Sequence, residues 1–241
     1  MKFKKLYRLY INSLLKENTT VNLTKEQTNY LINVLRVKNN NQIRVFNETD
    51  GEYLATISYI PNKKLILNII SQIRQAQLDS HYLTLAQCII KPDRMVRVID
   101  MATQIGVTDI IPIISEYSQY QKLNLEKYYK YIIEACEQSE RITIPNLLST
   151  KTLENFLVNN NLDCIIYANE QEKEQQIEKI TVSTISKTAV LIGPEGGFSP
   201  KDRFLLEKCD KVISISLGKN ILRSETAAAC TLAQLQLLKN M

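Results

Sequence analysis

The sequence predicts a two-part α/β protein, in which a small barrel-like module precedes a mainly parallel sheet flanked by helices. Strand-like runs gather in the first seventy or so residues, and strand and helix patterns alternate from Tyr82 onward. Four of the six glycines lie between Gly193 and Gly218. Alternating strands and helices are typical of parallel sheets covered by helices. We therefore expect the module over residues 1–73 and the α/β domain over residues 74–241.

The composition favours a soluble, globular protein. The chain has 241 residues, 44% of them hydrophobic, which is enough for a genuine core. No apolar run approaches the roughly 18–20 residues of a membrane span, and no secretory leader pattern is visible, so we expect a cytoplasmic protein. The net charge of +5 is compatible with a polyanionic partner but does not demonstrate one.

Cysteine and histidine usage restricts the chemistry. The five cysteines are scattered without C-x-x-C pairs, and we expect reduced core thiols rather than a disulfide or zinc framework. His81 is the only histidine, so Ser-His-Asp catalysis and histidine-rich metal sites are nearly excluded. We expect no metal cofactor.

The first part of the chain reads as one helix followed by strands. Residues 24–37 place apolar side chains at helical spacing and predict a short amphipathic helix. Strand-like runs follow at 42–47, 52–60 and 64–71, and a turn around Asp50–Gly51 joins the first two as a hairpin. These elements suggest a compact module.

The remainder alternates regularly. The polar stretch 74–80 is read as a linker, and the charged run 170–179 as a solvated helix or loop. In the helix expected near 92–105, the apolar face consists of Met95, Val98, Ile99, Ala102 and Ile105. Gly106 stands where a helix-terminating glycine is expected. Strands are expected near 82–90, 108–115, 162–169, 188–192 and 211–217, and helices near 92–105, 124–141, 152–159, 200–208 and from Ser224 onward.

Two glycine turns stand out near the C-terminus, in "LIGPEGGFSPKD" (191–202) and "SLGKNILRSETAAA" (216–229). Each follows a predicted strand and leads into a helix, and Ser199 and Asp202 form a capping-box pattern. One such turn is ordinary. Ligands of parallel sheets bind at the carboxyl ends of strands, so two turns at adjacent strand ends predict one cofactor cleft. Neither G-x-G-x-x-G nor G-K-[ST] is present, which disfavours a phosphate loop.

Together these two segments resemble the C-terminal signature of the small-subunit ribosomal RNA methyltransferase E family. The segments "KPDRM", "MATQIGVTDIIPIISEYS" and "EACEQSERITIP" also resemble family segments, in the same order. The N-terminal "YLINVLRVKNNNQIRVFN" is similar to the family's PUA-like RNA-binding barrel. The resemblance implies a SPOUT-type domain with a trefoil knot and S-adenosylmethionine as cofactor. It also implies methylation of N3 of a uridine in 16S ribosomal RNA, with the 30S subunit as partner and a homodimer as the working form.

The resemblance also implies a set of site residues. Arg223 is the candidate for stabilising the uridine anion, with an ion pair to Glu225 or another carboxylate as the alternative. Glu195 is the candidate for orienting the cofactor or accepting a proton, and the two roles stay open. The residues matched to the cofactor loops are Leu191, Gly193, Glu195, Gly196, Leu217, Gly218, Ile221, Leu222 and Arg223.

Basic side chains supply the candidate RNA contacts. Lys91, Arg94 and Arg97 recur every three residues and so share one side of a predicted helix. A solvated charged face is the alternative for such rows, and the resemblance favours RNA contact. The other candidates are Gln138 and Arg141 on the second long helix, and Arg8 and Arg36 in the small module.

Departures from the family pattern concern RNA docking. Asn29–Tyr30 replaces a common histidine pair, Met101 a common lysine, and Glu140 a usual glycine. Other functions remain open at this point: another SPOUT methyltransferase acting on transfer RNA or a ribose 2′-hydroxyl, or a non-catalytic RNA-binding protein. A nicotinamide-dependent dehydrogenase is disfavoured by the missing G-x-G-x-x-G.

Overall fold

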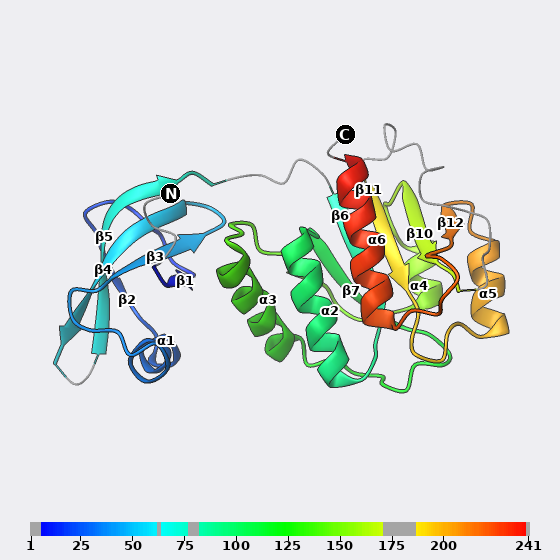
Figure 1. Ribbon diagram of the computed structural model, residues 1–241, viewed down its shortest axis with the longest axis horizontal. Helices are drawn as coiled ribbons and strands as arrows, with labels where there is room; N and C mark the ends of the chain where they lie inside the picture. The colour runs from blue at the N-terminus through cyan, green and yellow to red at the C-terminus, as the bar shows by residue number, and fades with distance from the viewer. Residues whose placement is uncertain (1–5, 62–63, 77–81, 171–186, 240–241) are drawn as a thin grey trace. The chain divides into compact units, whose positions relative to one another are not determined.

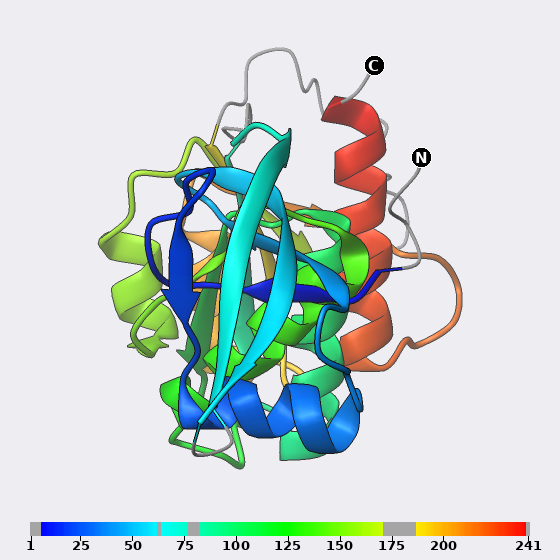
Figure 2. The same cartoon turned by 90° about the vertical axis from the view of Figure 1, so that its left-hand side faces the viewer.

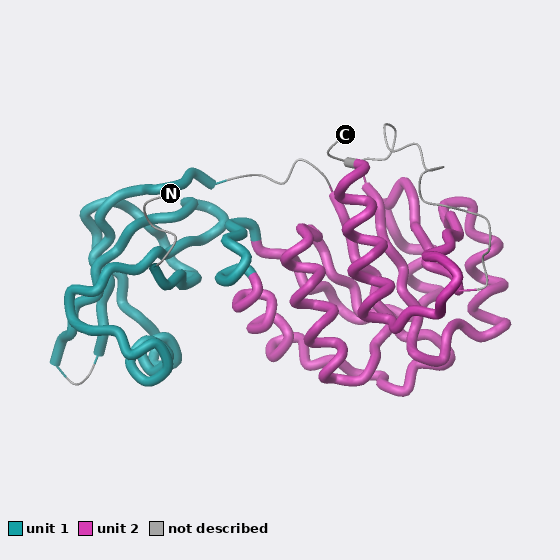
Figure 3. The backbone as a smooth tube through the Cα atoms, viewed as in Figure 1, with its two compact units in different colours: residues 1–78, 136–143 teal, residues 79–135, 144–241 magenta. Residues whose placement is uncertain are grey.

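The chain forms two compact units (Figures 1 and 3). The computed structural model describes residues 6–61, 64–76, 82–170 and 187–239. Unit 1 comprises residues 1–78 together with 136–143, and unit 2 comprises residues 79–135 and 144–241. The end of the expected linker, His81 and nearly all of the charged run 170–179 lie outside the described residues.

Unit 1 is built on a five-stranded sheet with the order β1-β3-β4-β5-β2. The first strand pairs in parallel with β3, and the other pairs are antiparallel. The three predicted strands are confirmed, whereas the sequence did not indicate the two three-residue strands β1 and β2. The strands are β1 (Arg8–Tyr10), β2 (Thr20–Asn22), β3 (Gln42–Asn47), β4 (Gly51–Ile60) and β5 (Lys64–Arg74).

The predicted hairpin depends on Gly51. Its φ is +91°, a left-handed conformation that favours glycine. A Cβ at this position would lie 2.4 Å from the carbonyl oxygen of Arg74 on the neighbouring strand. Gly51 therefore allows β4 to begin against β5 directly after the turn.

The predicted N-terminal helix is present but changes its winding. It consists of α1 (Lys25–Asn29) and a π-helical turn η1 (Tyr30–Val34). Thr24 caps α1 in a capping box with Gln27, and Leu31 is fully buried in the core of the unit. Figures 1 and 2 show this helical segment at one end of the sheet.

A buried carboxylate organises the interior of unit 1. Glu52 is 0% exposed, and its Oε1 accepts a hydrogen bond from Arg8 Nε at 2.7 Å. Its Oε2 pairs with Arg74 Nε, and Arg44 Nη1 lies 3.6 Å from Oε1. Burial lowers the pKa of the Arg8 guanidinium, and the charge of Glu52 opposes that shift. We call Glu52, Arg8, Arg44 and Arg74 the Glu52 cluster.

The Glu52 cluster explains why residues 136–143 belong to unit 1. Arg8 donates to the carbonyl oxygens of Cys136 and Arg141, the latter at 2.8 Å. Arg74 Nη2 donates to the carbonyl oxygen of Glu140 at 2.7 Å. The carbonyl groups at a helix C-terminus carry partial negative charge, which these cations complement.

The backbone at Glu140 accounts for a departure noted in the sequence. Glu140 has φ +61°, a conformation that glycine adopts without steric cost. In this chain the side chain at that position has a partner, because Arg44 Nη2 donates to Glu140 Oε1 at 2.9 Å. The ion pair offsets part of the backbone strain that a non-glycine residue incurs here.

Unit 2 is a parallel sheet in the order β12-β10-β11-β6-β7-β8, with β9 paired to β7. All its strand pairs are parallel, which confirms the predicted class. No helix in the described part of the chain is long and apolar enough to span a membrane. The strands are β6 (Tyr82–Cys88), β7 (Asp109–Ile114), β8 (Asn146–Leu147), β9 (Lys151–Thr152), β10 (Cys164–Ala168), β11 (Lys187–Ile192) and β12 (Val212–Ile215).

Helices cover both faces of this sheet. The helices of this part of the chain are α2 (Pro92–Ile105), α3 (Leu125–Ser139), α4 (Leu153–Val158), α5 (Pro200–Glu207) and α6 (Ser224–Lys239), and the end of α3 belongs to unit 1. On one face, apolar residues of α4 and α5 share a core with alternate residues of β6, β7, β10 and β11. On the other face, α6 packs against α2, β6 and β11 (Figure 1). After β11 the chain therefore passes β10 and forms β12 at the edge of the sheet. It then returns as α6, which packs over β11. Whether this path closes a trefoil knot stays a prediction.

Helix α2 matches its predicted pattern closely. Met95, Val98, Ile99 and Ala102 are buried, as their helical spacing predicted. The helix ends at Gly106, whose φ of +108° forms the left-handed cap. Met101, one of the departures from the family pattern, is half-buried on this helix.

The five cysteines match the expectation of core thiols only in part, because Cys209 is half-buried and Cys230 is exposed. All five are free, and Cys88, Cys136 and Cys164 are buried. Burial raises the pKa of the Cys88 and Cys136 thiols to about 12 and that of Cys164 to about 11. These thiols remain protonated near neutral pH and pack as apolar groups.

Replacing Glu52 by glutamine should lower the free energy of unfolding by about 3–5 kcal/mol, because three arginines then lose their buried counter-charge. Equilibrium denaturation in urea measures the change. Glu48→Gln is the matched control, since Glu48 is exposed four residues earlier and its replacement should cost less than about 0.5 kcal/mol. Equal stability of the two variants would contradict the proposed importance of the cluster.

Candidate functional site

The first glycine turn connects β11 to α5 at the carboxyl edge of the unit 2 sheet. Gly197 N donates to Pro194 O at 3.0 Å, which closes the turn. Gly197 has φ +68°, and a Cβ there would lie 2.8 Å from Glu170 Oε1. Ser199 and Asp202 form the predicted capping box at the start of α5. The turn is thus fixed at both ends.

The second glycine turn connects β12 to α6. Gly218 has φ +110°, and a Cβ at that position would meet nothing within 4 Å, so its backbone faces open space. Ile221 is 84% exposed, which is unusual for a large apolar side chain and suits contact with a ligand. Arg223 is also exposed.

The two turns do not follow adjacent strands, which corrects the arrangement expected from the sequence. Strand β10 lies between β11 and β12, so its carboxyl end separates the turns. A hollow opens there, between the end of β10, the second glycine turn and α6. Its lining residues are Ala168, Asn169, Glu170, Leu217, Gly218, Asn220, Leu222 and Ala227.

Three predicted cofactor residues, Leu217, Gly218 and Leu222, line this hollow. Leu191 does not, because it is 0% exposed and packs in the core beside Phe198. The sequence missed the residues at the end of β10. Only the strand order, which places β10 between the two turns, identifies them.

Hydrogen bonds fasten the two turns together. Ser224 Oγ, at the start of α6, donates to Gly193 O at 2.9 Å across 31 residues of sequence. Gln87 Nε2, at the end of β6, donates to Ser224 Oγ at 2.9 Å and to Cys88 O at 2.9 Å. Gln87 is 0% exposed. This Gln87–Ser224–Gly193 link brings the segments that hold the predicted cofactor residues into one site.

A group of charged residues, Arg94, Glu195 and Glu225, lies beside this link. Arg94, near the start of α2, lies 3.7 Å from Glu195 Oε1 and 4.0 Å from Glu225 Oε1. Lys91 N donates to Glu195 Oε1 at 3.3 Å. The guanidinium of Arg94 therefore lies between a carboxylate of the first turn and one that follows the second. Glu225 pairs with Arg94, and Arg223 remains at the surface.

The predicted RNA-contact residues fall into different environments. Lys91 and Arg97 are exposed on α2, as RNA contact requires, whereas Arg94 between them pairs with carboxylates. In unit 1, Arg36 and Gln138 are exposed. Arg141 is half-buried, and its Nε donates to Thr143 Oγ1 at 3.0 Å.

Arg8, also predicted to contact RNA, is 6% exposed and belongs to the Glu52 cluster. Its guanidinium also lies 3.5 Å from the centre of the Phe46 ring. This packing gives Arg8 a structural role inside unit 1, so we do not include it among the proposed RNA contacts.

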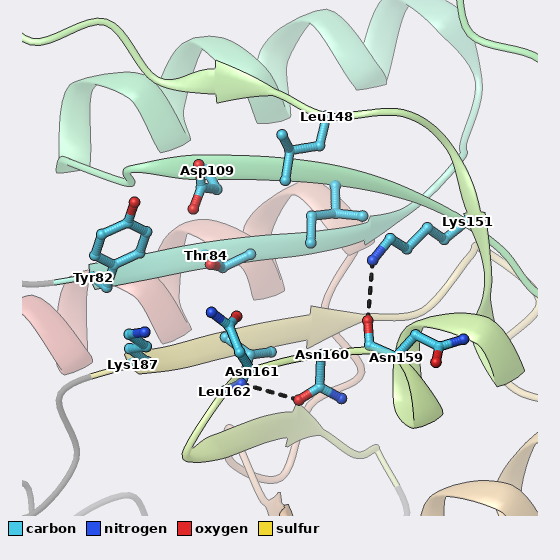
Figure 4. A pocket seen from close by; sticks show the side chains of 11 residues that line it. Tyr82, Thr84, Asp109, Leu148, Lys151, Asn159, Asn160, Asn161, Leu162 and Lys187 are labelled. Atoms are coloured by element: carbon cyan, nitrogen blue, oxygen red, sulfur yellow. Dashed lines mark hydrogen bonds between the residues drawn. The ribbon is translucent and has the colours of Figure 1, made fainter.

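A larger hollow, of about 450 Å³, lies at the opposite edge of the unit 2 sheet (Figure 4). Tyr82, Asp109 and Lys187 begin β6, β7 and β11, so this hollow is at the amino ends of parallel strands. Lys151 Nζ donates to Asn159 O at 3.2 Å within it. None of the predicted site residues lines it, and parallel sheets bind ligands at the other edge. The carboxyl edge remains the candidate site.

Comparisons with known proteins identify the family of this chain. A family model described as an RNA methyltransferase domain matches residues 78–236, and one described as an RNA methyltransferase PUA domain matches residues 23–70. The chain is 43% identical to the ribosomal RNA small subunit methyltransferase E of Rickettsia conorii, over 97% of this chain and 96% of that protein. The chain belongs to the ribosomal RNA small subunit methyltransferase E family.

Other similar proteins support the assignment. The enzyme of Buchnera aphidicola subsp. Schizaphis graminum is 31% identical, over 97% of each chain. The solved structure of a putative methyltransferase from Legionella pneumophila, with bound cofactor SAM, is similar with a TM-score of 0.89 and 27% identity, over 97% of this chain and 98% of that one. The family enzyme of Neisseria gonorrhoeae bound to S-adenosyl methionine gives a TM-score of 0.85 with 27% identity and the same coverage.

Replacing Ser224 by alanine should lower the free energy of unfolding by about 1–3 kcal/mol, because Gly193 O and Gln87 Nε2 each lose a hydrogen bond in the interior. Thermal or urea denaturation measures the loss. Thr226→Ala, an exposed position two residues further along α6, is the control and should change stability by less than about 0.5 kcal/mol. A Ser224→Ala variant as stable as the control would show that the link contributes little.

Proposed function

We propose that this protein transfers a methyl group from S-adenosylmethionine to N3 of a specific uridine in the 16S ribosomal RNA of the small subunit. The observation that carries the proposal is the pair of glycine turns held together at the carboxyl edge of the unit 2 sheet. The SAM-bound structures from Legionella and Neisseria support the choice of cofactor. The names of the Rickettsia and Buchnera relatives support the choice of substrate.

The lining of the β10 hollow fits such a cofactor. Leu217, Leu222 and Ala227 offer apolar surface for the faces of an adenine ring, and Asn169 and Asn220 offer amides for its polar edge. The backbone at Gly218 faces open space, so its main-chain polar groups are also available to the cofactor. We propose that Gly193, Glu195, Gly196, Ile221 and Arg223 complete the cofactor site, with the backbone at Leu191 at its base.

Bound S-adenosylmethionine supplies an electrophilic methyl group on a sulfonium, so the reaction requires no metal ion. The protein has to align the uridine nitrogen with that methyl group and assist loss of the N3 proton. We propose that Arg223 stabilises the negative charge that develops on the uracil ring. Its exposed position at the end of the second glycine turn supports this role.

We propose that Lys91 and Arg97 of unit 2, and Arg36, Gln138 and Arg141 of unit 1, contact the RNA. Their charge or polarity and, for all but Arg141, their exposure support this assignment.

The family resemblance further leads us to propose a homodimer that works in the cytoplasm on ribosomal RNA or an assembling 30S particle. We propose a division into domains at residues 1–73 and 74–241, with residues 136–143 packed on the first.

The decisive experiment maps modified uridines in 16S ribosomal RNA from cells lacking this protein, before and after treatment with purified enzyme and S-adenosylmethionine. We expect one N3-methyluridine to be absent from the untreated RNA and restored by the enzyme. Calorimetry should show binding of S-adenosylmethionine and no binding of nicotinamide dinucleotides. Normal methylation in the deletion strain would refute the proposed substrate.

Arg223→Ala should reduce the single-turnover rate of methyl transfer by roughly 10²–10³-fold, the usual cost of removing one group that stabilises a developing anion. Quenched-flow measurement with radiolabelled S-adenosylmethionine checks the rate at saturating substrates. Lys201→Ala removes an equal charge from the exposed first turn of α5 and should leave the rate unchanged. An Arg223→Ala variant that methylates at the normal rate would remove this assignment.

A further inference from the structure

Glu225 is a buried carboxylate, and one of its two oxygens has no partner among the described residues. It is 7% exposed, and its Oε1 lies 4.0 Å from Arg94 Nε. Its Oε2 is buried and has no hydrogen-bond partner among the described residues. Leaving a buried carboxylate oxygen without a donor is costly in free energy, so such oxygens normally have partners. The free oxygen is therefore suited to a donor that arrives with a substrate.

The position of Glu225 places this acceptor beside the segments that hold the predicted cofactor residues. It is the second residue of α6, directly after Ser224, whose hydroxyl group holds Gly193 of the first glycine turn. It shares the cation of Arg94 with Glu195 of that same turn. Glu225 thus lies where the two glycine turns meet.

We propose that Glu225 is the catalytic residue that accepts the N3 proton of the target uridine. This inference rests on the proposed function and deepens it. The N3–H bond breaks, its electron pair stays on nitrogen, and the proton forms an O–H bond with Glu225 Oε2. The nitrogen pair then forms the new N–CH₃ bond as the C–S bond breaks, and the electrons of that bond remain on sulfur as a neutral thioether. Glu225 afterwards releases its proton to water.

The neighbouring charged groups are less suited to this task. Glu195 is more exposed, and its Oε1 already accepts from Lys91 N and faces Arg94. Arg223 carries no acceptor and is not deprotonated in proteins. Arg94 lies 4.0 Å from Glu225 Oε1 and so places a positive charge beside this carboxylate.

The first test is the isosteric variant Glu225→Gln, which retains the shape but cannot take up a proton. We expect the single-turnover rate at saturating S-adenosylmethionine to fall by roughly 10²–10⁴-fold. Binding of S-adenosylmethionine, measured by calorimetry, should change by less than about threefold. Glu207→Gln is the control, because Glu207 is exposed at the end of α5, and its rate should equal that of the wild type.

A second test uses no methyl donor. A bound general base should accelerate exchange of the uridine imino proton with solvent, which NMR detects for an RNA fragment that contains the target uridine. Wild-type protein should accelerate this exchange, and Glu225→Gln should not. In addition, 5-fluorouridine has a more acidic N3–H, so placing it at the target position should restore much of the rate lost by Glu225→Gln.

Two results would overturn the inference. One is unchanged methyl transfer and imino exchange in Glu225→Gln. The other is a large loss of S-adenosylmethionine affinity with a normal rate at saturation, which would show that Glu225 binds the ammonium group of the cofactor instead. If the glutamine variant does not fold, Glu225→Asp provides the test. Withdrawing the carboxylate by one methylene should slow both methyl transfer and imino-proton exchange. A wild-type enzyme without N3 activity would refute the proposed function separately.

Discussion

The site depends on the hydrogen bonds that Ser224 makes at the start of α6. Through them, two strand ends and a helix that are distant in sequence share one fixed geometry: β6 through Gln87, β11 through Gly193, and α6 through Ser224 itself. The side chains of Gln87 and Ser224 are buried, where an unmade hydrogen bond is costly in free energy. The link therefore specifies where α6 begins, and with it the positions of Arg223 and Glu225. Without this constraint, two flexible glycine turns would have no fixed relation to one another.

Charge is arranged differently in the two units, although both pair arginine with glutamate. In unit 1, both oxygens of Glu52 are paired with arginines, and Arg8 and Arg74 also bind backbone carbonyls while Arg44 binds Glu140, so the carboxylate has a structural role. In unit 2, one arginine is shared by two carboxylates and a buried oxygen is left over. A carboxylate with both oxygens paired contributes to folding, whereas a carboxylate with an unpaired oxygen is what a reacting proton requires. Burial of Glu52 thus serves folding, whereas burial of Glu225 serves the proposed proton transfer.

Several sequence-based expectations were accurate because their signals are local. The apolar face of α2, its terminal Gly106 and the capping box of α5 follow from side-chain spacing and capping chemistry within a few residues. Other expectations failed where distant contacts decide. Arg8 reads as a surface cation in the sequence but is buried against Glu52, 44 residues away. Leu191 belongs to a recognised motif, yet alternation along β11 points it into the core. Arg94 lies in a basic row, yet carboxylates 101 or more residues later engage it.

The sequence by itself determined the two-part organisation, the parallel α/β class and the two glycine turns, because each arises from local periodicity, capping and the conformational freedom of glycine. Only the tertiary structure decided that β10 separates those turns, that residues 136–143 belong to unit 1, and that Glu225 keeps a buried oxygen unpaired. Strand order and burial depend on long-range packing. Many strand orders and registers satisfy the same local sequence pattern, and the hydrogen bonds of buried polar groups select one of them.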